Sequence, residues 1–155
     1  MPIPGPGVYE IVPYQAPELT MNAWDGKMDP GALVRTYTRD RANPSTNSLW
    51  YLALVAGSGD TAEYLIINVR TGYFLTATAD NTIVSTPQIS PADASAHRTL
   101  KYAPSRNYTL FTINSKISSR DQLTVKGAST ESGADILAAP ASDKDNTRWY
   151  FDRRT

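Results

Sequence analysis

The feature that most constrains the fold is a pattern that recurs three times along the chain. A Leu-Thr pair opens it at Leu19, Leu75 and Leu123, so the openings are 56 and 48 residues apart. Each opening follows a β-prone run and leads into a second one, and the outer two units close on Asn-x-x-Trp, at 47–50 and 146–149. A recurring unit of this length indicates a structural repeat. The chain is therefore predicted to be built from three similar units, at about 8–56, 62–103 and 108–152.

Each unit offers about four short strands. The predicted runs alternate apolar and polar residues, are rich in Val, Ile, Thr, Tyr and Phe, and lie between Gly, Pro, Asn and Asp turns. No window of a dozen residues carries an apolar stripe with helical period. Twelve strands in three units predict an all-β fold, a β-trefoil, in which a closed barrel and its hairpins leave few exposed edges. The 155 residues suit one domain, 1–155.

Composition excludes several kinds of function. The chain has no cysteine and a single histidine, His97, which rules out thiolate zinc sites and multi-histidine metal sites. Fifteen basic and fifteen acidic residues balance, so no basic field predicts binding to nucleic acid. No apolar run approaches the roughly 20 residues of a membrane span, which argues against membrane insertion. No cofactor is expected. The C-terminal arginines, interrupted by Asp152, are interpreted as a solvated end.

The segment 19–50 gathers the residues that a sugar pocket uses. Two aromatic side chains, two amides, a carboxylate and a guanidinium occur beside turns: Trp24, Tyr37, Asn22, Asn47, Asp25 and Arg35. An aromatic ring covers the apolar face of a pyranose, while amides and charged groups hydrogen-bond its hydroxyls. The alternative is that the aromatic residues belong to the core or its rim and the polar residues cap turns. The residue types alone leave both interpretations open.

The closing turns resemble the QxW motif of the ricin B-chain lectin family. The whole chain resembles fungal lectins of the Sclerotinia sclerotiorum agglutinin type, most clearly in VYEIVPYQAPELTMNAWDGKMDPGALVRTYTR and AEYLIINVRTGYFLTAT. The resemblance implies a single β-trefoil domain that binds glycans ending in galactose or N-acetylgalactosamine and forms a homodimer. It implies no catalysis.

The resemblance also implies one carbohydrate site, in the first unit. Asn22 occupies the position that is usually Asp in this family, and Arg35 occupies a position that is usually Gln. Tyr37 occupies the position of the aromatic residue that stacks on the sugar, and Asn47 that of the closing amide. A neutral amide at position 22 grips hydroxyls less strongly than a carboxylate, so Asp25 or Arg35 is expected to supply charge-assisted hydrogen bonds. Trp24 is expected to wall the pocket. The predicted carbohydrate-binding residues are Asn22, Ala23, Trp24, Asp25, Arg35, Tyr37 and Asn47.

The other two units are expected to have lost their sites. Thr78 and Lys126 are placed at the Asp position, and Ala139 replaces the stacking aromatic residue. Asn146 is interpreted as part of a turn. Trp50 and Trp149 are expected to be core residues, because large aromatic side chains dominate burial.

Two further functions are alternatives to a lectin. β-Trefoils also serve as protease inhibitors through surface loops, and the segments 85–96 and 138–146 are the candidate loops. An enzyme is disfavoured, because Asp143 and Asp145 lie in a Lys-containing, turn-like stretch and not across a cleft. The N-terminal sequence MPIPGPGVYEIV lacks the charged and apolar regions of a signal peptide, which predicts a cytoplasmic protein, or one released without a signal.

Overall fold

The computed structural model describes residues 4–87, 90, 92–116 and 122–154, and over these residues it is built from strands and single-turn 3-10 helices. The strands are β1 (Gly7–Pro13), β2 (Leu19–Ala23), β3 (Ala32–Thr38), β4 (Trp50–Ala56), β5 (Glu63–Asn68), β6 (Phe74–Ala77), β7 (Ile83–Thr86), β8 (Arg98–Tyr102), β9 (Phe111–Ser115), β10 (Gln122–Val125), β11 (Ile136–Ala139) and β12 (Trp149–Arg153). The 3-10 helices are η1 (Trp24–Gly26), η2 (Thr46–Ser48), η3 (Gly59–Thr61), η4 (Ala94–Ala96), η5 (Lys126–Ala128) and η6 (Asp145–Thr147). The all-β prediction is confirmed.

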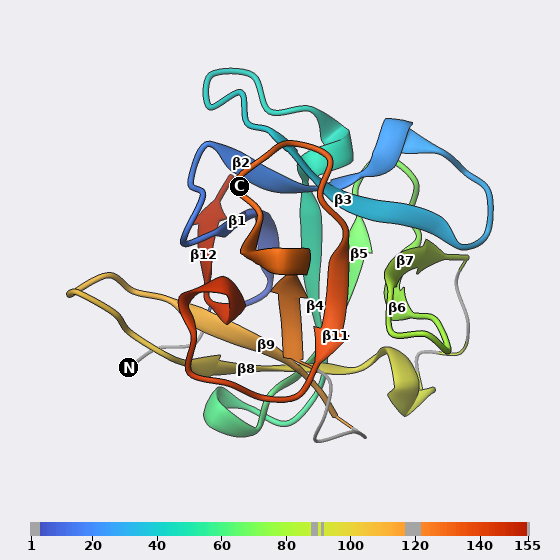
Figure 1. The fold of residues 1–155 in the computed structure, drawn as a ribbon. Helices are drawn as coiled ribbons and strands as arrows, with labels where there is room; N and C mark the ends of the chain where they lie inside the picture. Colours follow the sequence, from blue (N-terminus) through green and yellow to red (C-terminus); the bar gives the residue numbers. More distant parts are fainter. Residues whose placement is uncertain (1–3, 88–89, 91, 117–121, 155) are drawn as a thin grey trace.

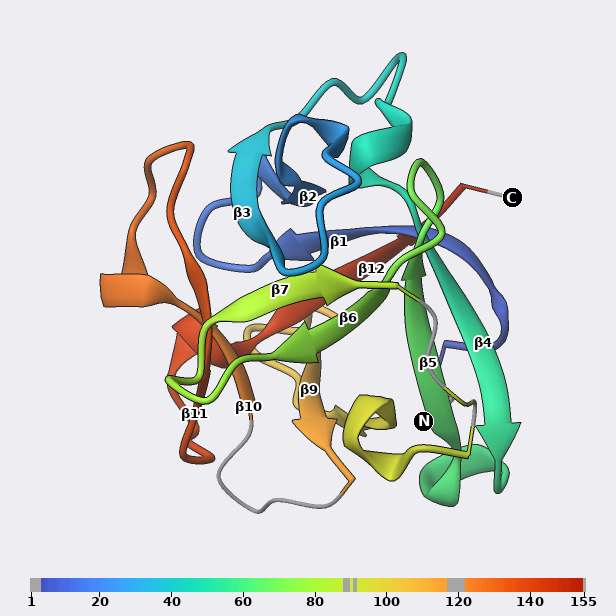
Figure 2. The same cartoon turned by 90° about the vertical axis from the view of Figure 1, so that its right-hand side faces the viewer.

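Six strands close a barrel and the other six form three hairpins (Figure 1). Strands β1, β4, β5, β8, β9 and β12 pair in that order, each antiparallel to the next, and β12 pairs back with β1. The hairpins are β2–β3, β6–β7 and β10–β11. Figure 2 shows them gathered beside one another, with β4 and β5 of the barrel on the other side. Strand β3 also pairs with β7, and isolated bridges link Arg35 to Asp135 and Thr82 to Leu137. This is a β-trefoil, as predicted.

The two closing tryptophans are the largest side chains of the core. Trp50 and Trp149 are both 0% exposed. The indole Nε1 of Trp50 donates to the carbonyl oxygen of Met21 at 3.0 Å, and that of Trp149 donates to the carbonyl oxygen of Leu123 at 3.2 Å. Each buried N–H thus has the partner that it requires. The prediction that both are core residues is confirmed.

These matching hydrogen bonds correct the alignment of the three units. They make Met21, and not Leu19, the equivalent of Leu123, and the hairpin register agrees, because Met21 faces Thr36 as Leu123 faces Ala138. Leu75 faces Ser85 in the same way. The equivalents of Asn22 are therefore Thr76 and Thr124.

The placement of Thr78 and Lys126 at that position was wrong by two residues. Both instead correspond to Trp24: Lys126 begins η5 as Trp24 begins η1, and the residue after each has a positive φ.

The interpretation of the C-terminal arginines as a solvated end holds only in part, because Arg153 is exposed but both it and Arg154 make specific contacts. Arg154 binds the buried carboxylate of Glu10, with Nη2 at 2.6 Å from Oε1. Arg153 donates to the hydroxyl of Tyr9 at 2.9 Å, and its guanidinium lies 5.5 Å from the centre of that ring. The cause is barrel closure, since the pairing of β12 with β1 brings residues 144 positions apart into contact. None of the helices in the described residues has the length and apolarity of a membrane crossing.

A cluster of charged side chains around Glu63 is expected to make the stability of the protein depend on pH in the acid range. The Nδ1 of His97 lies 3.0 Å from Glu63 Oε1, and the Nζ of Lys116 lies 3.3 Å from Oε2. The hydrogen bond with His97, followed by the effects of Lys116, holds the pKa of Glu63 below its usual value of 4.5. A carboxyl group whose pKa is lowered by folding stabilises the protein above its unfolded-state pKa and loses that contribution as the pH falls through the folded-state pKa.

We therefore expect Glu63→Gln to flatten the acid limb of the stability profile. Urea unfolding measured from pH 7 down to pH 3 should show a smaller loss of stability than in the wild type. Glu18→Gln is the matched control, because Glu18 is exposed and its side chain has no ion pair within the described part of the chain. An acid limb of equal slope in Glu63→Gln and wild type would contradict the prediction.

Candidate functional site

The site forms where the β2–β3 hairpin meets the closing turn of the same unit. Strand β2 ends at Ala23, and the chain turns through η1, with positive φ values at Asp25 (58°) and Gly26 (59°). A Cβ on residue 26 would lie 2.7 Å from the Oδ1 of Asn47. Glycine is therefore favoured here for two reasons, the backbone conformation and the close approach of η1 to η2. This close approach brings Asp25 and Asn47 to the same opening.

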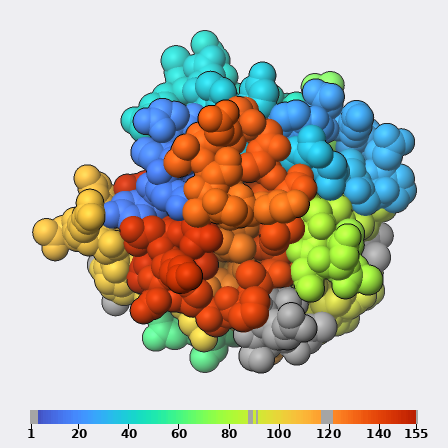
Figure 3. Space-filling model, in the orientation of Figure 1, coloured from blue at the N-terminus to red at the C-terminus, as the bar shows by residue number. Residues whose placement is uncertain are grey.

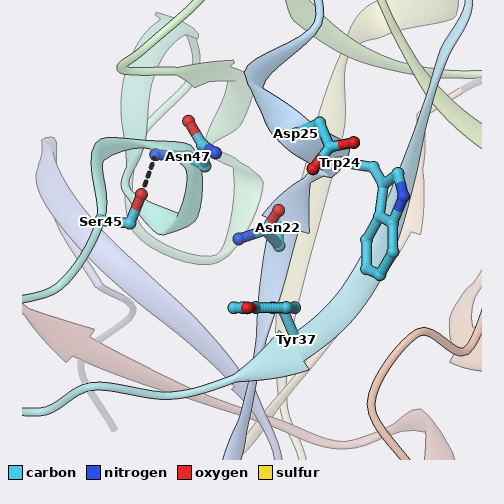
Figure 4. Close-up of a pocket in the computed structure, with 6 residues that line it drawn as sticks. All are labelled: Asn22, Trp24, Asp25, Tyr37, Ser45 and Asn47. Carbon is cyan, nitrogen blue, oxygen red and sulfur yellow. Dashed lines mark hydrogen bonds between the residues drawn. The ribbon is translucent and has the colours of Figure 1, made fainter.

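Six side chains surround a cavity of about 260 Å³ (Figure 4). They come from β2, η1, β3, η2 and the residue that precedes η2: Asn22, Trp24, Asp25, Tyr37, Ser45 and Asn47. Figure 4 shows the amides, the carboxylate and the two rings arranged around the same space. The cavity is small and open, which fits a single sugar ring better than a large ligand.

Hydrogen bonds within the protein hold the polar residues of the cavity in place. Asn22 is 4% exposed, and its Nδ2 donates to the Oγ of Ser48 at 2.8 Å, which leaves its carbonyl oxygen as an acceptor. Ser45 caps η2, because its Oγ accepts the backbone N–H of Asn47 at 3.2 Å. The backbone carbonyl of Asn47 accepts from the Nδ2 of Asn68 at 2.9 Å. The side chain of Asn22 and the backbone of Asn47 are thus held by hydrogen bonds, and none of these uses the Asn47 side-chain amide.

The aromatic wall consists of two rings at right angles. Tyr37 is 49% exposed, and its ring centre lies 5.9 Å from that of Trp24 with an interplanar angle of 80°. An edge-to-face contact of this kind is favourable and fixes both ring planes. The exposed face of Tyr37 offers an apolar platform beside hydrogen-bonding groups.

Most of the predicted site residues come together here, and two do not. Asn22, Trp24, Asp25, Tyr37 and Asn47 line the cavity. Ala23 is 2% exposed and packs in the core. Arg35 does not line the cavity; its Nε binds Asp135 Oδ1 at 3.0 Å. That these residues bind carbohydrate stays a prediction.

Ser45 was missed by sequence reasoning. The signal was present, because a serine two residues before Asn47 is a typical N-cap for the turn that carries that amide.

The equivalent positions of the other units lack this chemistry. Hairpin register places Thr86 and Ala139 where the first unit has Tyr37. In the third unit, Asn146 Nδ2 donates to Thr124 Oγ1 at 2.7 Å, and this hydroxyl donates to the Asn146 carbonyl at 3.0 Å. Asn146 lies in the turn η6, as interpreted, and its side-chain amide is engaged by Thr124 on strand β10 of the same unit. The described residues contain no group of His, Cys, Asp or Glu that could hold a metal ion.

Comparison with solved structures identifies the fold. The chain superposes on ThreeFoil, a designed threefold-symmetric protein, with a TM-score of 0.79 and 18% identity over 96% of this chain and 99% of that one. It superposes on the C-terminal half of the earthworm R-type lectin, solved with GalNAc, with a TM-score of 0.71 and 16% identity over 96% of this chain and all of that one. At these identities the likeness shows the fold alone, which is the β-trefoil of R-type lectins.

Sequence comparison gives the family. The agglutinin of Sclerotinia sclerotiorum is 64% identical over 150 residues, which cover 97% of each chain. No protein-family model matches. The chain belongs to this family of fungal agglutinins, which are lectins and not enzymes, and the relationship suggested by its sequence is confirmed. Inhibition of proteases through a surface loop stays an untested alternative, and the candidate loop 85–96 lies partly outside the described residues.

Proposed function

We propose that the protein binds glycans ending in galactose or N-acetylgalactosamine through the first-unit cavity. The observation that carries the proposal is the arrangement of Tyr37 beside Asn22, Asp25 and Asn47 around one cavity of about 260 Å³. Galactose has an apolar face and, on the adjoining edge, two neighbouring hydroxyl groups, O3 and O4. The ring of Tyr37 suits the apolar face, and amide and carboxylate groups suit the hydroxyl pair. The earthworm lectin of the same fold was solved with GalNAc, which supports this choice of sugar.

The charge of the lining favours a neutral sugar. Asp25 is the only carboxylate among the lining residues, and no lysine, arginine or histidine is among them. The proposed role of Asp25 is to accept hydrogen bonds from sugar hydroxyls, and a charged acceptor forms the stronger bonds. An acidic substituent on the terminal sugar would meet this carboxylate without a compensating cation.

We propose further that the protein acts as a homodimer. An agglutinin must hold two glycans at once, and this proposal gives each chain one site. A second copy then supplies the second site, and the gain comes from avidity and not from a tighter single contact. Sedimentation of the purified protein should give twice the mass of the chain.

The test of the sugar site is Tyr37→Ala. Loss of the stacking ring should weaken binding of N-acetylgalactosamine about tenfold, because an aromatic contact of this kind contributes about 1.4 kcal/mol at the upper end of its range. Isothermal titration calorimetry with N-acetylgalactosamine, galactose and glucose measures this, and the first two sugars should bind the wild type at one site per chain.

The matched control is Tyr51→Ala. Tyr51 is 45% exposed on β4 and does not line the cavity, so its removal should leave affinity unchanged. Equal affinity in Tyr37→Ala and wild type would place the site elsewhere. Failure of the wild type to bind any of the sugars would reject the proposed function.

A further inference from the structure

An ion pair joins the third unit to the first beside the sugar cavity. The Nε of Arg35, on β3, lies 3.0 Å from the Oδ1 of Asp135, which immediately precedes β11. The two side chains are 30% and 29% exposed, so the pair is partly shielded from solvent. Figure 3 shows the orange surface of the third unit lying directly against the blue and cyan surface of the first. The contact thus connects residues 100 positions apart in sequence.

The backbone holds Asp135 in place without help from its carboxylate. Thr36 N–H donates to the Ala134 carbonyl at 3.0 Å, and Gly133 N–H donates to the Thr36 carbonyl at 2.7 Å. The Ala134 N–H also donates to the Oγ1 of Thr36 at 3.1 Å, and Thr36 is fully buried. On the other side, the Asp135 carbonyl accepts from Lys126 N–H at 2.9 Å. Loss of the Asp135 side chain should therefore leave the contact between the units intact.

The guanidinium of Arg35 also contacts Trp24, which forms part of the cavity wall. Its Cζ lies 5.1 Å from the centre of the Trp24 ring, within the range of a cation–π interaction. The ring of Trp24 in turn makes an edge-to-face contact with the ring of Tyr37, and the two ring centres are 5.9 Å apart. A Cβ on Gly133 would lie 3.5 Å from Trp24 Cη2, so the third unit also limits the space around the indole. These contacts connect Asp135 to Arg35, Arg35 to Trp24, and Trp24 to Tyr37.

We propose that Asp135 is a positioning residue for the carbohydrate site of the first unit. Its carboxylate fixes the Arg35 guanidinium against Trp24, and Trp24 then holds its place as the wall of the cavity beside Tyr37. Arg35 thereby supports the site from behind and makes no direct contact with the sugar. This inference rests on the proposed function, since it assigns a role within that site.

The other two units do not repeat this arrangement. By hairpin register, Val84 and Leu137 occupy the position of Arg35, and Thr78 and Lys126 that of Trp24. The cation–π contact therefore belongs to the unit that has the cavity. A loop of the third unit, which has lost its own stacking aromatic residue, contributes to the site of the first.

The test is Asp135→Ala, read out at Trp24. The chain has three tryptophans, and Trp50 and Trp149 are 0% exposed, so acrylamide quenching of fluorescence reports mainly on Trp24. Asp135→Ala should increase quenching and weaken N-acetylgalactosamine binding about threefold, since release of one partly exposed cation–π contact corresponds to a change of this size. The melting temperature should stay within about 2 °C of the wild type, because a partly exposed ion pair contributes little stability. Arg35→Lys should show the same changes, because an ammonium group lacks the planar stacking surface of a guanidinium.

The matched control is Asp145→Ala, which removes another ion pair of the third unit, with Arg148 at 3.3 Å; neither residue lines the cavity. It should change neither quenching nor affinity. Unchanged quenching and affinity in Asp135→Ala, with the wild type binding sugar, would overturn the positioning role and leave the proposed function standing. Absence of binding in the wild type would reject the proposed function, and the quenching comparison would still decide whether Asp135 positions Trp24.

Discussion

Trp50→Ala is expected to lower the free energy of unfolding by about 3–5 kcal/mol. The side chain is 0% exposed and belongs to the main core cluster, so its removal leaves a large cavity among residues that cannot fully collapse. It also leaves the Met21 carbonyl without the indole N–H that donates to it at 3.0 Å. Urea denaturation followed by far-ultraviolet circular dichroism measures the loss. A typical domain has 5–15 kcal/mol in all, so the variant should be near the limit of folding.

Two variants separate this effect from the loss of any tryptophan. Trp149→Ala should have a similar cost, because Trp149 is equally buried and makes the equivalent hydrogen bond to Leu123. Trp24→Ala should cost much less, because Trp24 is only partly buried at the edge of the cavity. A cost below about 1 kcal/mol for Trp50→Ala would mean that the closing tryptophan does not carry the core of its unit.

The fold could be predicted because its constraints are local and repeated. Each strand shows its own alternation of apolar and polar residues, and the turns between strands carry Gly, Asn and Asp. Trp50 and Trp149 end their units at matching positions, and a side chain of that size is found inside a small domain more readily than outside it. Three copies of one pattern then leave few architectures other than a threefold one.

The alignment of the units could not be predicted because a shift of two residues preserves the pattern of a strand. Leu19 and Met21 lie on the same side of β2 and are 4% and 0% exposed. Either one satisfies the apolar alternation, since side chains on one face of a strand recur every second residue. The indole hydrogen bonds to Met21 and Leu123 distinguish the two alternatives, and these bonds depend on tertiary structure.

The site was predicted in outline for the same local reason. Asn22, Trp24 and Asp25 are close in sequence, and pairing of β2 with β3 places Tyr37 next to them. Arg35 could not be assigned in this way, because its partner Asp135 lies in another unit. A charged residue beside a pocket binds whichever opposite charge the tertiary fold brings to it.

The buried carboxylate of Glu10 provides the second large expected effect. Glu10 is 0% exposed and faces Asp152 directly across β1 and β12, a placement that would be repulsive on its own. Two guanidinium groups compensate: Arg39 Nη2 lies 3.1 Å from Glu10 Oε1, and Arg154 Nη2 lies 2.6 Å from the same oxygen. Both arginines also bind Asp152. The cluster joins the first strand, the last strand and the residue after β3.

Glu10→Leu is expected to cost about 3 kcal/mol in the free energy of unfolding, because it leaves Arg39, whose side chain is 7% exposed, without its buried partner. Arg39→Leu should have a similar cost for the reciprocal reason. The double variant should be more stable than the sum of the two losses predicts, because apolar side chains can replace a buried ion pair at little cost. Chemical denaturation of the four proteins, wild type included, gives the coupling energy.

Asp152→Asn is the control for this cycle. Its side chain is 45% exposed, so the loss of its charge should cost less than about 1 kcal/mol although it binds the same two arginines. Strictly additive losses in the cycle would show that Glu10 and Arg39 stabilise the barrel independently. A positive coupling energy would show that removal of both charges, Glu10 and Arg39, costs less stability than the two single removals added together, because each is buried as the partner of the other.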